Sequence, residues 1–125
     1  MGSFISTSPF VELPFRGEKK KLIGNVISFD ENATDEEIIN TIINAKCDRI
    51  QATKEPNKSE ISILNEIYRI KPDIGFRFLI MFGPDVDISF LLKINNLRTI
   101  YLDSHPNIMN IDIIKKMKLD KLVEF

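Results

Sequence analysis

Apolar residues occupy the first, fourth and sixth positions of the stretch Leu97-Arg98-Thr99-Ile100-Tyr101-Leu102. The alternation of Ile100 and Leu102 with their neighbours is typical of a β-strand that buries one of its faces. The same pattern recurs along the chain, clearly in two further stretches and at two of the three positions in two more. These four copies are Phe76-x-x-Leu79-x-Met81, Cys47-x-x-Ile50-x-Ala52, Ile23-x-x-Val26-x-Ser28 and Leu119-x-x-Leu122-x-Glu124.

Helical patterns lie between the copies of this strand motif. Thr34-Asp35-Glu36-Glu37 is a capping box, and apolar residues follow it at helical spacing through Ile43. A second helix is expected from Ser59, with Pro72 just beyond its end, and two shorter helices are expected near Leu91 and Ile114. A helix between two strands returns the chain to the end of the sheet where the first strand began, so strands that alternate with helices form parallel sheets with right-handed crossovers. We therefore expect an α/β fold with parallel strands.

The motif copies begin at residues 23, 47, 76, 97 and 119, so they are spaced by 24, 29, 21 and 22 residues. Over residues 23–125 this pattern resembles the leucine-rich-repeat proteins, in an irregular and helix-bearing form. The resemblance implies a short solenoid of about five strand–helix units, in which each unit buries its apolar face against its neighbours. The family has Asn or Cys at the ninth position of each unit. This chain instead has Glu31, Glu55, Pro84 and His105 there.

The N-terminal part is expected to form a β-hairpin over residues 9–29 that caps the solenoid. Phe10–Leu13 and Lys20–Phe29 are its candidate strands, and Gly17 can take a positive φ in the turn between them. The length of 125 residues suits a single domain over residues 1–125. The alternative architecture is an α/β sandwich, whose buried strands are also short apolar runs.

In the solenoid, the third, fifth and seventh residues of each strand motif face away from the helices. We expect these residues to form a protein-binding surface, because several of them are large and apolar. In the alternatives, residues 1–15 fold over this surface, or helices cover both sides of the sheet. The candidate partner-binding residues are Arg49, Gln51, Phe78, Ile80, Phe82, Tyr101, Asp103, Lys121 and Val123.

The charge and hydropathy of the chain favour a cytoplasmic protein without nucleic-acid or membrane contacts. The 17 Lys and Arg residues balance the 18 Asp and Glu residues, whereas a nucleic-acid-binding domain normally has a basic excess. The longest apolar stretch, from Phe76 to Gly83, is too short to span a bilayer. A single cysteine, Cys47, excludes an intrachain disulfide, and we expect it to be buried and inert.

No catalytic signature is evident, so we expect no catalytic residue, no metal site and no cofactor. Asp103-Ser104-His105 contains the residue types of a hydrolytic triad, but a triad needs side chains that converge from separate segments. The alternative function is an α/β enzyme or a domain that binds a metal or small ligand through acidic residues at the strand ends. Those residues are Asp30, Glu31, Glu55, Asp85, Asp87 and Asp103.

The favoured function is therefore a non-catalytic protein–protein interaction module, which binds a protein partner or a second copy of itself. A small binder without catalytic equipment suits an intracellular inhibitor, such as a bacterial immunity protein. The Ile-, Lys- and Asn-rich composition is compatible with an AT-rich genome.

Overall fold

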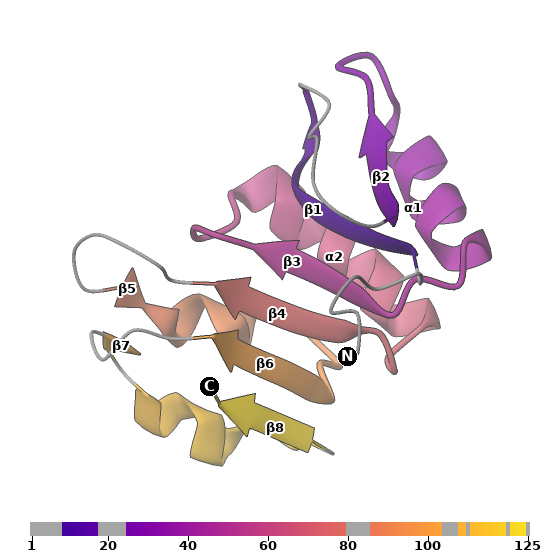
Figure 1. The fold of residues 1–125 in the computed structure, drawn as a ribbon. Helices are drawn as coiled ribbons and strands as arrows, with labels where there is room; N and C mark the ends of the chain where they lie inside the picture. The colour runs from indigo at the N-terminus through magenta and orange to yellow at the C-terminus, as the bar shows by residue number, and fades with distance from the viewer. Residues whose placement is uncertain are drawn as a thin grey trace, which may run out of the picture.

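The computed structural model describes residues 9–17, 25–79, 86–103, 108–109, 111–119 and 121–124. Strands and helices alternate along most of this part of the chain (Figure 1). The elements are β1 (Pro9–Arg16), β2 (Asn25–Phe29), α1 (Asp35–Asn44), β3 (Arg49–Ala52), α2 (Lys58–Ile70), β4 (Gly75–Leu79), β5 (Val86–Asp87), η1 (Ile88–Lys93), β6 (Thr99–Asp103), β7 (Ile108–Met109), η2 (Ile111–Lys116) and β8 (Lys121–Glu124), where η marks a 3₁₀ helix.

Six strands form one sheet in the order β2-β1-β3-β4-β6-β8, and every neighbouring pair in it is parallel. The short strands β5 and β7 make a separate parallel pair. The expectation of an α/β fold with parallel strands is therefore confirmed. From β3 onward, each strand of the large sheet lies beside the next one in the chain, which is the order that a repeat would give.

The expected hairpin over residues 9–29 is wrong. Gly17 does adopt a positive φ, but β1 and β2 run parallel, with Val11 opposite Ile27. Strand β1 also pairs with β3 on its other side, so Val11 lies opposite Ile50. Residues 9–15 are thus an internal strand of the sheet, and they do not cover its surface. The hydrophobic Phe10–Leu13 run could not distinguish an internal parallel strand from one arm of a hairpin, because both bury apolar side chains.

Polar side chains cap both α-helices at their N-terminal ends. The Thr34 hydroxyl accepts a hydrogen bond from the Glu37 amide at 3.1 Å, as the sequence predicts. In α2, the Asn57 side chain accepts from the Glu60 amide at 2.9 Å, and the Glu60 carboxylate accepts from the Asn57 amide at 2.8 Å. This reciprocal capping box starts α2 at Lys58, one residue before the predicted Ser59.

The core lies between the sheet and the helices, all of which pack on one side of the sheet (Figure 1). The helices contribute apolar residues at helical spacing, such as Ile38 and Ile42 of α1 and Leu64 and Ile67 of α2. Strands β1, β3, β4 and β6 contribute every second residue to this core. These strand residues are Val11, Leu13, Phe15, Ile50, Ala52, Phe76, Phe78, Ile100 and Leu102.

The strand motif predicts the core-facing residues correctly in β3 and β6, but in β4 it is displaced along the chain. Ile50 and Ala52 of β3, and Ile100 and Leu102 of β6, point into the core as the fourth and sixth motif residues should. In β4, however, Phe76 lies opposite Ile100 and Phe78 lies opposite Leu102. The motif in this unit therefore starts at Asp73 and not at Phe76, and the spacing from Cys47 to Leu119 becomes 26, 24 and 22 residues.

In β2, the residues that face the core are displaced by one position from those that the motif predicts. Ile27 and Phe29 pack against the core, whereas the motif placed Val26 and Ser28 there. An odd displacement reverses the face of every side chain in a strand, because successive side chains point to opposite sides of the sheet.

Candidate functional site

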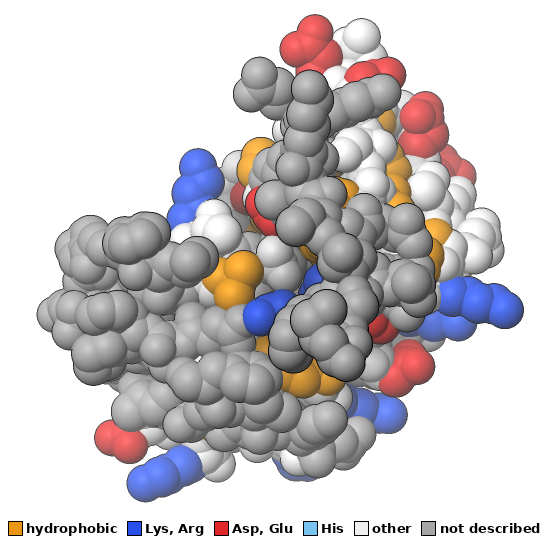
Figure 2. Space-filling view, in the orientation of Figure 1, with side chains coloured by type: hydrophobic (Ala, Val, Ile, Leu, Met, Phe, Trp, Pro, Cys, Tyr) orange, Lys and Arg blue, Asp and Glu red, His pale blue; other side chains and the backbone are white. Residues whose placement is uncertain are grey.

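The side of the large sheet that faces away from the helices is the candidate site, and we call it the open face. Its described side chains include those at alternate positions of four neighbouring strands, β1, β3, β4 and β6. These residues are Phe10, Glu12, Arg49, Gln51, Arg77, Leu79, Thr99 and Tyr101. Figure 2 views the molecule from this side, where charged and apolar side chains lie close together between the residues drawn in grey.

A row of residues crosses the open face in register. Gln51 lies opposite Glu12 on one side and Arg77 on the other, and Arg77 lies opposite Tyr101. The backbone of Val123 continues the row into β8. The row thus places an acid, an amide, a guanidinium and a phenol side by side, which gives the face both hydrogen-bonding and apolar contact capacity.

Side-chain contacts order the β1–β3 part of the open face. The Arg49 guanidinium lies 4.0 Å from the centre of the Phe10 ring, in a cation–π contact, and its Nη1 donates to Asp48 Oδ1 at 3.1 Å. Gln51 Nε2 donates to Glu12 Oε2 at 3.0 Å. Phe10 and Gln51 are both buried, with only 2% and 6% of their surface exposed. Arg49 and Gln51 therefore lie on the predicted face, but Gln51 offers little area to a partner.

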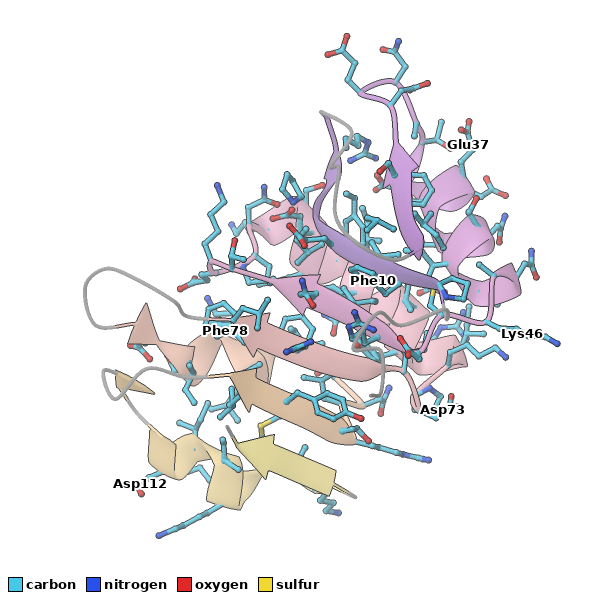
Figure 3. The ribbon with its side chains drawn as sticks, in the orientation of Figure 1. Phe10, Glu37, Lys46, Asp73, Phe78 and Asp112 are labelled. Carbon is cyan, nitrogen blue, oxygen red and sulfur yellow. The ribbon has the colours of Figure 1, made fainter. Side chains whose placement is uncertain are left out.

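The prediction for Phe78 is wrong. Its side chain is fully buried on the helix side, where its ring packs edge-to-face against Phe90 of η1 with the centroids 5.2 Å apart. Figure 3 labels Phe78 on β4 and Phe10 on β1. The displaced motif start explains the error, because a shift of three residues moves Phe78 from one face of the strand to the other.

The open-face residues of β4 are instead Arg77 and Leu79, which the motif analysis missed. The signal was present in the sequence. In Phe76-Arg77-Phe78, the charged residue alternates with two aromatic residues, and this alternation alone places Arg77 opposite the core. Glu12 was missed for a different reason, because its strand was assigned to a hairpin.

The remaining predicted residues are placed only in part. Tyr101 lies on the open face and is half-buried. Asp103, Lys121 and Val123 lie within β6 and β8, but their side chains lie outside the described part, as do Ile80 and Phe82 entirely.

The structure gives two of the acidic strand-end residues local roles. The Asp30 carboxylate accepts a hydrogen bond from the Asn32 amide at 2.8 Å, and the Asp87 carboxylate accepts one from the Ser89 amide at 2.8 Å. Such bonds hold a turn and the start of η1, respectively. Within the described residues, no three His, Cys, Asp or Glu side chains are grouped as a metal site requires. Asp85, Ser104 and His105 lie outside those residues.

Cys47 is buried, as predicted, close to Tyr68 of α2. Burial, together with the neighbouring Asp48 carboxylate, raises the pKa of the Cys47 thiol to about 11. The thiol is therefore protonated at neutral pH, whereas a nucleophilic cysteine needs a lowered pKa. Burial also raises the pKa of Tyr68 well above its usual value, and the Tyr68 hydroxyl donates to the Gly75 carbonyl at 3.2 Å.

Comparison of the chain with protein-family models, with curated proteins and with solved structures gives no match. Among the described helices, none combines the length and the apolar character needed to cross a membrane.

Proposed function

We propose that this chain is a non-catalytic protein-binding module with a leucine-rich-repeat-like stack, and that the open face is its contact surface. The observation that supports the proposal is the placement of α1, α2, η1 and η2 on one side of the sheet (Figure 1). Parallel sheets commonly have helices on both faces, and a sheet with helices on one face only is typical of solenoids that bind through the other.

The contact residues that we propose are Tyr101, Leu79 and Arg77, with Arg49 and Glu12 around them. Tyr and Arg are the side chains that most often dominate the binding energy of a protein interface. Leu79, two residues beyond Arg77 on β4, adds apolar area to the same face. Phe78 is excluded from this set because it belongs to the core.

An inhibitory role, of the kind that immunity proteins perform, is the version of this function that we favour. Arg49 is already held by Phe10 and Asp48, and Glu12 by Gln51, before any partner arrives. A surface whose side chains are already ordered loses little conformational entropy on binding, so it can support the high affinity that an inhibitor needs.

The test is a comparison of two double variants in quantitative pull-downs from cells of the source organism. Arg77→Glu with Tyr101→Asp changes the open face, and Lys58→Glu with Ile70→Asp makes matched changes at exposed positions of α2. A specific partner should be retained by the wild type and by the α2 variant, and lost from the open-face variant. Urea denaturation of both variants confirms that they are folded.

Any partner found in this way is then purified and titrated against the three proteins in a calorimeter. We expect the open-face variant to weaken binding at least about tenfold. For a second copy as the partner, analytical ultracentrifugation should show a wild-type dimer and a Tyr101→Asp monomer. Unchanged capture and affinity in the open-face variant would refute the proposal.

A further inference from the structure

A pocket of about 370 Å³ lies on the helix side of the molecule, away from the open face. The end of η1, the loop that leads to β6, and the end of η2 with the residues after it form its walls. We call it the basic pocket, and six of its residues form the apolar floor and the charged rim. They are Leu92, Ile94, Arg98, Lys116, Met117 and Lys118.

The floor of the basic pocket is apolar. Ile94 is buried and belongs to the core, and Met117 is half-buried against the same cluster. Leu92 is 46% exposed, and it is one of two large hydrophobic residues in the described part of the chain that are this accessible. Leu92 and the flexible Met117 side chain together offer an apolar contact that water now covers.

The rim of the basic pocket is cationic. Arg98, Lys116 and Lys118 are exposed, and none of the described residues that line the pocket is acidic. Within the described residues, these three cations take part in no ion pair, whereas the adjacent Lys115 pairs with Asp112 at 3.7 Å. Three like charges around one apolar depression repel each other, so an anionic group that enters between them is stabilised by all three.

The loop on one side of the pocket is held in place by α2. Asn65 Nδ2 donates to the Lys93 carbonyl at 3.0 Å, and the Asn95 amide donates to Asn65 Oδ1 at 2.6 Å. The following residue, Asn96, takes a positive φ of 65° and turns the chain toward Leu97. These contacts form the pocket wall without a ligand, which lowers the entropic cost of binding.

We propose that the basic pocket binds an acidic segment of a partner protein, which places one apolar side chain on Leu92 and Met117 and its carboxylates against Arg98, Lys116 and Lys118. Charge complementarity argues for an acidic ligand. The exposed side chains around the pocket favour a peptide segment over an enclosed small molecule. This site does not depend on the open face, because the two surfaces share no residue and lie on opposite sides of the sheet.

The test is a fluorescence-anisotropy titration with a fluorescein-labelled peptide, Asp-Glu-Leu-Phe-Glu-Asp, and its neutral counterpart, Asn-Gln-Leu-Phe-Gln-Asn. We expect saturable binding of the acidic peptide in the micromolar range, and at least about tenfold weaker binding of the neutral one. Lys116→Glu with Lys118→Glu should weaken acidic-peptide binding by about tenfold or more, and Leu92→Asp should weaken it as well.

Two control variants separate this site from general electrostatics and from the open face. Lys46→Glu with Lys58→Glu makes the same change of charge at exposed positions elsewhere, and Arg77→Glu changes the open face. Both should leave peptide binding unchanged. The proposal is overturned by equal losses in the Lys46/Lys58 variant, by equal affinity for the two peptides, or by no saturation at about 1 mM peptide. Displacement of the peptide by dodecanoate, at a concentration close to that of the protein, would instead assign the pocket to a fatty acid.

Discussion

The ring of Tyr101 lies directly over Gly75 of the neighbouring strand. A Cβ atom built on Gly75 would lie 2.6 Å from Tyr101 Cε2 and 3.4 Å from the Asp48 carbonyl oxygen. On the opposite side of the strand, the Tyr68 hydroxyl donates to the Gly75 carbonyl. The absence of a side chain at position 75 thus leaves room for one edge of the Tyr101 ring on the open face, while Tyr68 anchors the same residue to α2.

Gly75→Ala should lower the free energy of unfolding by about 1–2 kcal/mol, because the added methyl group displaces the Tyr101 ring from its strand. Urea denaturation measures this loss. In the double variant Gly75→Ala/Tyr101→Ala, the effect of the added methyl group should largely disappear, since its obstacle is gone. Strict additivity of the two single effects would contradict the packing of Tyr101 on Gly75.

Phe78→Ala should lower the free energy of unfolding by about 3–5 kcal/mol, the loss typical of a buried aromatic residue. Its neighbour Arg77 supplies the control, because Arg77→Ala changes the open face and should cost less than about 1 kcal/mol. The same urea experiment compares them. A larger loss in Arg77→Ala than in Phe78→Ala would show that β4 has the opposite register.

The stability of the fold should decrease at alkaline pH. Burial raises the pKa of Cys47 and Tyr68, so the folded state keeps both groups protonated while the unfolded chain ionises them. Their contribution is complete below the usual thiol pKa of 9.0 and is lost as the pH rises toward the folded value of about 11 for Cys47. Thermal denaturation across this range measures the decline.

Tyr68→Phe isolates the tyrosine part of this effect. At neutral pH it should cost about 1 kcal/mol, because the Gly75 carbonyl loses its hydrogen bond. Above pH 10.0, the usual pKa of a tyrosine, the variant should lose stability less steeply than the wild type, since one of the two titrating groups is absent. Parallel pH profiles for the two proteins would contradict this assignment.

Cys47 should resist thiol reagents in the folded protein. The thiolate is the reactive species, and both burial and the raised pKa keep its population low at neutral pH. Alkylation by iodoacetamide, followed by mass spectrometry, should be slow in buffer and complete in urea. Rapid modification of the folded protein would place Cys47 at an accessible surface.

Asn65→Ala should destabilise the loop between η1 and β6, because two backbone groups, on Lys93 and Asn95, lose their partner. We expect a loss of about 1–3 kcal/mol in unfolding free energy and weaker binding of the acidic peptide. Asn65→Asp retains the acceptor for the Asn95 amide but not the donor for the Lys93 carbonyl, so its effects should be intermediate. Equal effects of both substitutions would show that only the donor matters.

The sequence predicted the parallel α/β arrangement and the first helix cap, because alternation and capping depend on residues close together in the chain. The motif predicted the buried residues correctly around Ile50 and Ile100, because polar neighbours there allow only one choice of the buried face. It failed at β4, where apolar residues from Phe76 to Met81 satisfy two registers, and only pairing with β3 and β6 selects one.

The sites depended even more on tertiary structure. Arg77 lies on the open face because pairing with β3 sets the register of β4. Glu12 lies there because β1 is an internal strand that pairs with β3. The basic pocket joins η1 to η2 through residues about twenty positions apart, and none of them forms a recognisable motif. A pattern in a short stretch of sequence cannot reveal contacts between residues this far apart in the chain.

The parallel order of the sheet also determines where the molecule loses its structure first. Among the described strands, β3 and β4 have a partner on each side, whereas β2 and β8 lie at the margins of the sheet with one partner each. Since most strands pair with their nearest neighbours in the chain, opening at either margin breaks few bonds in the middle. Amide hydrogen exchange should therefore be slowest at Ile50 and Phe76 and become faster toward both margins of the sheet. The outer strands open first, and the central strands keep their hydrogen bonds longest.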